Sequence, residues 1–321
     1  MDSSTVPPAI GQFDARYLAF LETIAGLRPS LHRYCARMTG SALDGEDVVQ
    51  EALFQAYRNL ESWNDALPLA PWLFRIAHNR CIDFLRRRSV RAGAEAAVAA
   101  ESADSVPPAE PLGPELGLAV EHLVIALPPK ERASVLLKDV FDYTLEEIAE
   151  LVDSTVGGVK AALNRGRGKL AALQASAATS ARPEPVERSA DPQMSRLLEL
   201  YVERFNCGDW DGLRDLISAD ARLLVADRFS GRLGDSPYFG QYQRSPGSWR
   251  VALGLVDGEA VVVTLRRDPA ASPAWLPHAA VRLTLGERGV AEVTDYAHCP
   301  WVLRGATALF VSGVTDRLEL Q

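Results

Sequence analysis

The spacing of apolar residues predicts two helical stretches followed by a stretch that mixes helices and strands. Over 14–88, and again over 117–173, apolar side chains recur every three or four positions, as on one face of an amphipathic helix. From about residue 193 the pattern changes, because one amphipathic helix precedes several strand-like runs. The expected strands cover 222–226, 249–255, 260–266, 279–285 and 290–296.

Two segments of different composition separate these stretches. Residues 89–116 and 174–192 are rich in alanine, proline and polar residues, a composition that buries too little apolar surface to become ordered. We therefore interpret them as linkers. The sequence predicts a multidomain protein in which two all-α units, 10–88 and 117–173, precede an α+β unit at 193–321.

The distribution of charge sets two basic segments against an acidic background. The 321-residue chain has a formal net charge of −8, which argues against a generally basic nucleic-acid-binding protein. However, 75–88 contains five arginines and one aspartate, and 154–170 contains four basic residues and no acidic one. Positive charge concentrated in two short helical segments favours two separate DNA contacts over diffuse binding.

Composition also bears on location and on metal chemistry. No run of about 18 apolar residues is present, and Met1–Thr5 lacks the features of a signal peptide, so we expect a cytoplasmic protein. The four cysteines lie far apart and are most simply buried thiols. His32 with Cys35, and His78 with Cys81, have the spacing for a shared zinc site, but packing explains them adequately. We expect no metal and no cofactor.

The clearest local motif lies between residues 127 and 170. Leu127–Pro129 opens a helix, because proline is tolerated in a first turn. Thr144–Glu147 has the form of a capping box and predicts a short helix over 145–151. The turn-forming residues Val152–Ser154 then lead into a basic helix over 155–170. This order of helix, short turn and basic helix is the layout of a helix-turn-helix.

The two faces of the basic helix predict different roles. At about 100° per residue, Val159 and other apolar residues point to one side, which must pack against the protein. Asn164 and Arg165 lie on the opposite side, and these residue types read base edges, whereas Lys160 and Lys169 are better suited to phosphates. An ordinary helical hairpin with a solvated basic face is the alternative.

Two helices of the first unit also separate into faces. In 44–57 the residues expected on the outer face are Asp47, Gln50, Glu51 and Phe54. An exposed phenylalanine among acids is typical of a partner contact, and a solvated face with one stray aromatic is the alternative. The segment 71–88 carries a stripe of tryptophan, arginine and asparagine that fits nucleic acid. The members of this stripe are Trp72, Arg75, Asn79, Asp83 and Arg86.

These motifs together resemble a known family. Residues 44–51 and 71–83 resemble region 2 of extracytoplasmic-function sigma factors. Residues 127–132, 143–149 and 159–167 resemble region 4 of the same family. The resemblance implies a protein that binds core RNA polymerase and directs it to promoters, with no catalytic residues of its own. The polymerase would perform the chemistry.

The resemblance also implies roles for individual residues. The acidic helix would dock on the polymerase clamp through Asp47, Gln50, Glu51 and Phe54. The −10 promoter element would be bound by Trp63, Asn64, Trp72, Arg75, Asn79, Arg80, Asp83, Arg86 and Arg87. The −35 element would be read in the major groove by Thr155, Lys160, Asn164, Arg165, Arg167 and Lys169. Gly157-Gly158 departs from the larger or polar residues that many relatives carry at the start of this helix.

The last unit resembles a different family. Residues 197–213 and 216–223 resemble the helical entry of the SnoaL-like fold, in which helices pack on a curved sheet around a cone-shaped cavity. Catalysis, small-ligand sensing and contact with the rest of the protein are all compatible with that fold. Groups that could act as a base by type are Asp227, Asp257, Asp295, Tyr296 and His298. No pair of them has a diagnostic spacing, and Asp257 suits its Asp-Gly hairpin turn. We favour intramolecular control of the helical units.

Two further interpretations explain part of the chain. A helix-turn-helix regulator with a ligand-sensing domain leaves the first 88 residues without a role. A cavity enzyme tethered to DNA is another alternative, for which the sequence names no substrate. We therefore expect a sigma factor whose partners are core RNA polymerase and promoter DNA. We expect its activity to be modulated by the SnoaL-like domain, with no membrane contact.

Overall fold

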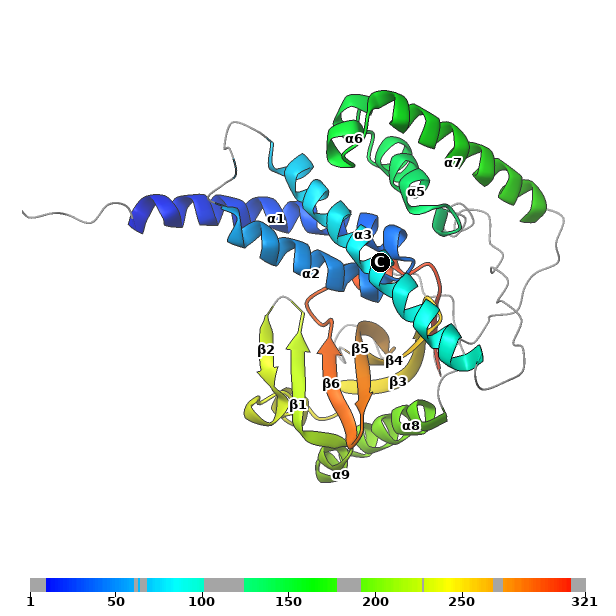
Figure 1. Ribbon diagram of the computed structural model, residues 1–321. Coiled ribbons are helices and arrows are strands. Elements are labelled where there is room, and N and C mark those ends of the chain that lie inside the picture. Colours follow the sequence, from blue (N-terminus) through cyan, green and yellow to red (C-terminus); the bar gives the residue numbers. More distant parts are fainter. Residues whose placement is uncertain are drawn as a thin grey trace, which may run out of the picture.

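A helical half lies above a sheet-containing half in the computed structural model (Figure 1). The structure describes residues 10–60, 63, 68–100, 124–177, 192–226, 228–267 and 274–312. Within these ranges no helix has the length and apolar content needed to cross a membrane.

The first helical unit consists of α1 (Ile10–Thr39), α2 (Ala42–Arg58) and α3 (Leu69–Ala100). Gly45 lets α2 approach α1 closely, since a Cβ atom at this position would lie 2.5 Å from the backbone nitrogen of Ala36. Tyr34, Val49 and Leu73, one from each helix, are buried in a common core. The segregation of apolar side chains predicted for 14–88 therefore produces a three-helix unit.

Both predicted linkers begin with helix instead, so the expectation for their first residues is wrong. Helix α3 continues through 89–100, and α7 (Val156–Ala177) continues through 174–177. Both extensions are rich in alanine, the residue with the highest helix propensity, and this outweighs the polar composition. The remaining parts of the two predicted linkers, 101–116 and 178–191, lie outside the described residues.

The second helical unit consists of α5 (Pro129–Val135), the π-helical turn η2 (Leu136–Val140), α6 (Leu145–Leu151) and α7. The predicted capping box is confirmed. The Thr144 hydroxyl accepts the Glu147 N–H at 3.2 Å, and the Glu147 carboxylate accepts the Thr144 N–H at 2.7 Å. Asp153 turns the chain between α6 and α7 with a φ of 50°. The expected helix-turn-helix is therefore present.

The C-terminal unit begins with α8 (Pro192–Cys207) and α9 (Trp210–Asp215). The strands are β1 (Ile217–Val225), β2 (Phe229–Arg232), β3 (Trp249–Val256), β4 (Glu259–Arg266), β5 (Leu276–Gly286), β6 (Gly289–Asp295) and β7 (Leu309–Val311). Short helical elements connect them: η3 (Leu233–Asp235), α10 (Gly240–Gln243) and α11 (Trp301–Gly305). All five expected strands are present, and the predicted α+β class is confirmed. The short strands β2 and β7 were not predicted.

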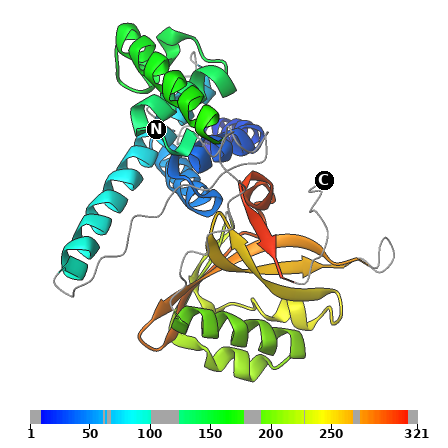
Figure 2. The same ribbon diagram turned by 90° about the vertical axis from the view of Figure 1, so that its right-hand side faces the viewer.

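The strands form one sheet in the order β2-β1-β6-β5-β4-β3-β7, in which only the β1–β6 pair is parallel. Alternate residues of β4 point to opposite faces, so Val262 packs in the core with α8 while Val261 and Val263 pack in a second core. That second core also contains Ala42 and Leu43 of α2. Figure 2 shows α8 and α9 on one side of the sheet and the first helical unit on the other.

The two helical units also share one core. Tyr34 and Phe74 of the first unit contact Phe141, with ring centroids 6.0 and 5.2 Å away, and Phe74 also contacts Tyr143. Arg132 of α5 donates to the carbonyl of Met38 at the end of α1. The three units therefore pack into one body.

The histidines and cysteines considered for a zinc site have structural partners. His32 Nε2 lies 2.9 Å from the Ala42 carbonyl oxygen, and His78 Nδ1 lies 2.8 Å from the Tyr34 hydroxyl. Cys35 and Cys81 are buried thiols. Among the residues that the structure describes, no group of three or more His, Cys, Asp or Glu side chains is arranged to hold a metal.

Candidate nucleic-acid interface and partner surface

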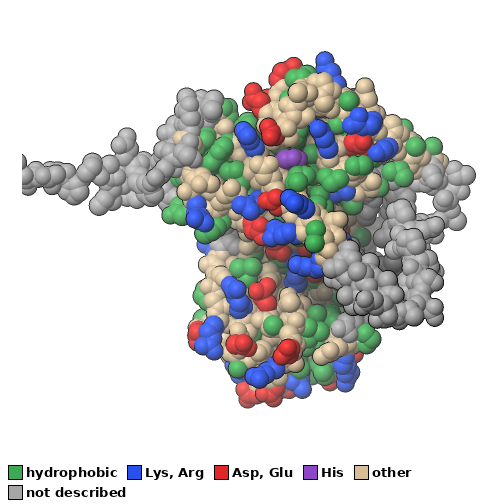
Figure 3. Space-filling view, viewed as in Figure 1, with side chains coloured by type: hydrophobic (Ala, Val, Ile, Leu, Met, Phe, Trp, Pro, Cys, Tyr) green, Lys and Arg blue, Asp and Glu red, His purple; other side chains and the backbone are tan. Residues whose placement is uncertain are grey.

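The outer face of α3 carries the stripe expected from the sequence. Arg75, Asn79, Asp83 and Arg86 are exposed along it. In the space-filling view, Lys and Arg side chains gather around the middle of the helical half (Figure 3). The structure therefore presents these polar side chains on an accessible surface.

Two tryptophans lie at the start of this face. Trp72 is partly buried and stacks on Trp63, with ring centroids 6.3 Å apart and planes inclined by 30°. Asn64, also predicted to bind the −10 element, lies outside the described residues. The stacked pair leaves both indoles only partly accessible.

Two of the predicted −10 arginines are directed toward α2. The Arg80 Nε donates to the Gln55 side-chain oxygen at 2.7 Å, and Arg87 lies 3.5 Å from the Glu51 carboxylate. Both pairs cross between α3 and α2. The family resemblance implied a −10 role for these arginines and did not reveal that they also reach the partner surface.

A groove separates the α3 face from the second helical unit. It has a volume of about 550 Å³, and its lining residues are His78, Asn79, Ile82, Asp83, Pro128, Pro129, Lys130 and Val152. Burial lowers the pKa of His78 to about 4, so this side chain is neutral at pH 7. Asn79 and Asp83 thus face the helix-turn-helix unit across a narrow space.

The outer face of α7 matches the projection. Gly157, Ala161, Asn164 and Gly168 are exposed, together with Lys160. The opposite face, including Val159 and Leu163, is buried. Asn164 and Lys160 are therefore accessible to DNA whose major groove receives α7.

Thr155 has a structural role at the start of α7. Its hydroxyl accepts the Gly158 N–H at 3.0 Å, which caps the helix. A Cβ atom on Gly158 would lie 2.8 Å from the Ser154 hydroxyl, so glycine fits this tight start.

Three other predicted −35 residues form ion pairs inside the second unit. Arg165 and Lys169 contact the two Glu131 carboxylate oxygens at 3.0 and 2.8 Å. Hydrogen bonds from Lys169 and then Arg165 lower the pKa of Glu131. Arg167 pairs with Asp139 through two nitrogens. These cations must share or exchange partners in order to contact DNA.

The outer face of α2 is open at its C-terminal end. Phe54 is 64% exposed, and the Arg58 guanidinium lies 5.9 Å from its ring centroid. Glu51 is also exposed, whereas Gln50 is partly buried. An accessible aromatic ring beside a carboxylate suits a protein partner better than it suits solvent.

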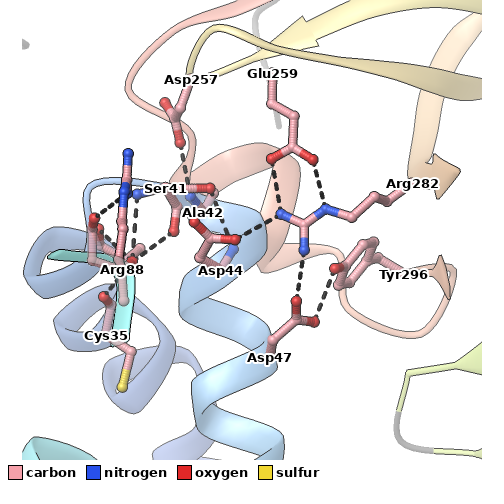
Figure 4. Close-up of polar contacts among 12 residues, drawn as sticks. Cys35, Ser41, Ala42, Asp44, Asp47, Arg88, Asp257, Glu259, Arg282 and Tyr296 are labelled. Atoms are coloured by element: carbon pink, nitrogen blue, oxygen red, sulfur yellow. Dashed lines mark hydrogen bonds and ion pairs between the residues drawn. The ribbon is translucent and has the colours of Figure 1, made fainter. Parts of the chain in front are cut away.

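The N-terminal end of the same face is covered by the C-terminal unit. Arg282 of β5 donates to Asp47 at 2.6 Å and to Asp44 at 2.9 Å, and it also binds Glu259 of β4 (Figure 4). The Tyr296 hydroxyl donates to Asp47 at 2.9 Å. We call this cluster, consisting of Arg282, Asp44, Asp47, Glu259 and Tyr296, the Arg282 latch.

The Arg282 guanidinium in the latch stays charged, whereas burial raises the pKa of its partner Asp47 to about 6. Burial disfavours the guanidinium cation, but the neighbouring Tyr296, Asp47 and Glu259 raise the pKa of Arg282 above its usual range. Its side chain is 16% exposed. Sequence reasoning missed Arg282, although the signal was present as a lone charged residue in the apolar strand 279–285.

Two more contacts hold the C-terminal unit against α1 and α2. Asp257 accepts the Ala42 N–H at 2.8 Å, near the start of α2 (Figure 4). It also accepts two hydrogen bonds from Thr307. The buried Glu46 pairs with Arg28 at 2.5 Å and accepts the Trp301 indole N–H at 2.7 Å. Asp257 lies in its hairpin turn as expected, but its carboxylate also joins the two units.

Aromatic side chains fill the space between α8 and the sheet, where the resemblance implied a cavity. The buried rings there belong to Tyr201, Phe205, Tyr238, Phe239 and Tyr242. Asp295, one of the candidate bases, is 1% exposed and accepts hydrogen bonds from the Tyr238 hydroxyl and the Ala297 N–H, each at 2.8 Å. Burial raises the pKa of its carboxyl group. Asp227, another candidate base, lies outside the described residues.

Comparison with known proteins assigns the helical units. Residues 23–91 match the model of Sigma-70 region 2, and residues 117–170 match that of Sigma-70 region 4. The ECF RNA polymerase sigma factor SigW of Bacillus subtilis is 32% identical over 162 residues, which cover 47% of this chain and 87% of SigW. SigG of Mycobacterium tuberculosis, also an ECF sigma factor, is 31% identical over 240 residues, which cover 67% of this chain. The chain spans 61% of SigG's length.

Similar solved structures include one that covers most of this chain and one that covers about a third of it. The extracytoplasmic-function sigma factor SigJ of Mycobacterium tuberculosis has a TM-score of 0.34 and 19% identity, over 89% of this chain and 99% of SigJ. A putative ketosteroid isomerase from Kribbella flavida has a TM-score of 0.25 and 24% identity, over 31% of this chain and 73% of its own. TM-scores this low assign no function. On the region matches and the SigW identity, the chain belongs to the ECF RNA polymerase sigma factors.

Proposed function

We propose that this protein binds core RNA polymerase and directs it to promoters with −10 and −35 elements. The observation that carries the proposal is the order of three exposed faces: the acidic and aromatic face of α2, then the mixed face of α3, then the basic face of α7. This order matches the order of functions in the family. The polymerase supplies the catalysis, and the protein works beside it in the cytoplasm.

The accessible residues divide between the partners. Phe54 and Glu51 bind the polymerase, joined by Asp47 and Gln50 when the C-terminal unit moves. The α3 stripe binds the −10 element, and Asn164 with Lys160 makes the first contacts at the −35 element. Base edges are read by Asn164, whereas Lys160 neutralises phosphate.

Binding to core polymerase tests the first part of the proposal. Labelled full-length protein is titrated with purified core polymerase, alongside Phe54→Ala and Phe310→Ala. Phe310 is a matched control, because it is 61% exposed but belongs to β7 and not to the outer face of α2. Phe54→Ala should weaken binding at least tenfold, and Phe310→Ala should leave it unchanged. Absence of binding by every form, including a form with the Arg282 latch opened, would contradict the proposal.

We further propose that the C-terminal unit restrains the sigma units in the free protein. The contacts of Arg282 and Tyr296 with Asp47 support this, because they engage both carboxylate oxygens and place the C-terminal unit over this side chain. The shared core of Tyr34, Phe74 and Phe141 supports a second restraint, since it holds the −10 and −35 units side by side. Release of the C-terminal unit should therefore raise the affinity for polymerase, and the Arg282→Ala experiment below measures this.

A further inference from the structure

One end of the C-terminal sheet carries a cluster of arginines and tryptophans. We define the arginine–tryptophan cluster as Trp249, Arg250, Arg266, Arg267 and Trp275. The start of β3 and the end of β4 are paired here, with Trp249 opposite Arg266, and Arg266 is in turn opposite Leu276 at the start of β5. Strand pairing therefore brings together residues that lie up to 26 positions apart in the sequence (275 − 249).

The indole rings fix the positions of the guanidinium groups. Arg250 and Arg267 lie over the Trp275 ring, at 5.0 and 4.7 Å from its centroid. Arg266 lies over the Trp249 ring at 5.6 Å. Cation–π contacts of this kind orient a guanidinium without neutralising its charge. The cluster is thus an ordered array of positive charges.

No carboxylate in the described part of the chain forms an ion pair with Arg250, Arg266 or Arg267. Arg250 and Arg266 are exposed. The neighbouring segments 244–250 and 274–278 contain no acidic residue in a chain of net charge −8, and Asp268, which directly follows Arg267, lies outside the described residues. Two like charges held on the same indole repel each other, and a bound anion removes that repulsion.

We infer that the arginine–tryptophan cluster binds the phosphate backbone of duplex DNA, as a contact additional to those of α3 and α7. The guanidinium fork matches phosphate geometry. Arg266 ends β4 and Arg267 follows it, and their guanidinium groups lie over different indoles, Trp249 and Trp275, so the positive charges are spread along the end of the strand. The arginines cover the indole faces, so the contact does not depend on base stacking or on sequence.

The position of the cluster makes this contact independent of promoter reading. Figure 2 shows α3 on one side of the molecule and the start of β5 on the other. A DNA segment on the cluster is therefore distinct from the segment on α3. The inference depends on the proposed function only in that DNA is the polyanion the protein meets during initiation.

The salt dependence of DNA binding tests the inference. Full-length wild type and the double variant Arg250→Gln/Arg266→Gln are titrated onto a labelled duplex of scrambled sequence over a series of salt concentrations. Each phosphate contact contributes about 0.9 to the slope of log K against log salt, so the variant's slope should be smaller by about 1.8. Arg250→Lys/Arg266→Lys keeps the charge and should retain most of the slope. Thermal unfolding of each variant confirms that it is folded.

A matched control removes the same charge elsewhere in the domain. Arg196→Gln/Arg214→Gln alters two exposed arginines of α8 and α9, each already paired with an acid, and should leave the slope unchanged. Equal slopes for wild type and Arg250→Gln/Arg266→Gln would overturn the inference. Displacement of the DNA by polyglutamate at equal charge concentration would also overturn the inference, because it would identify an acidic protein as the ligand. Displacement by inorganic phosphate would overturn it by identifying a free anion as the ligand. Polymerase binding, measured separately, reports on the proposed function, and its loss does not alter the slope.

Discussion

Replacing Arg282 with alanine should release the restraint on the polymerase-binding face. The substitution removes one cation that serves three carboxylates, Asp44, Asp47 and Glu259. Asp44 and Asp47 then remain unpaired while the C-terminal unit covers them, and they regain water when it moves away. The substitution therefore destabilises the closed form relative to the open form.

The magnitude follows from the burial of the partners. Breaking a fully buried ion pair costs about 3–5 kcal/mol, and breaking an exposed one costs about 0–1 kcal/mol. The side chains of Asp44, Asp47 and Glu259 are 21%, 36% and 30% exposed, which places this cluster between those limits. We expect a shift of about 1–3 kcal/mol toward the open form, or roughly 5- to 150-fold in the equilibrium.

The assay is the apparent affinity for core polymerase. When only the open form binds, the apparent Kd equals the intrinsic Kd divided by the open fraction, so Arg282→Ala should tighten binding by up to the same factor. Arg222→Ala is the control, because Arg222 is exposed on β1 of the same sheet. If folded Arg282→Ala binds polymerase with the same affinity as wild type and Arg222→Ala, the reasoning is refuted.

Further substitutions test other parts of the structure. Asn164→Ala should weaken binding to a matched −35 duplex by about 1–3 kcal/mol and leave binding to scrambled DNA unchanged. Lys160→Ala should weaken binding to both duplexes equally. Titrations of each variant on the two duplexes distinguish these outcomes. Burial lowers the pKa of His78 to about 4, so the unfolded chain takes up the proton first as pH falls below about 6.5. His78 alone should therefore lower the free energy of unfolding between pH 6.5 and 4 by up to about 1.4 kcal/mol per unit, whereas Asp47, whose pKa burial raises to about 6, contributes with the opposite sign. The difference between wild type and His78→Gln in denaturant titrations isolates the His78 contribution. Thr144→Ala removes both hydrogen bonds of the Thr144 hydroxyl and should lower the unfolding free energy by about 1 kcal/mol.

Local chemistry made the helical units predictable from sequence. The capping box at Thr144 and the periodicity of Val159 and Leu163 depend on residues a few positions apart, and both predictions are confirmed. The strands from 249 to 296 were predicted for the same reason, since alternation and the Asp257-Gly258 turn are local signals.

Contacts between distant segments were not predictable from sequence. Arg282 meets Asp47 across 235 positions, and Asp257 meets Ala42 across 215. Neither pair has a spacing that a periodicity argument detects. The filling of the expected cavity likewise depends on how Tyr201 of α8 and Tyr238, well after it in the chain, pack across the sheet.

Promoter-specific transcription is the most direct test of the central claim, that this chain is a sigma factor restrained by its own C-terminal unit. Purified core polymerase is supplied with wild type, Phe54→Ala or Arg282→Ala at equal concentration, on a library of genomic templates, and transcript 5′ ends are mapped. We expect start sites that are absent with core polymerase alone and that are preceded by common −10 and −35 sequences. Transcription from these sites should decrease with Phe54→Ala and increase with Arg282→Ala. If neither wild type nor Arg282→Ala adds any transcript to those of core polymerase alone, the claim is contradicted.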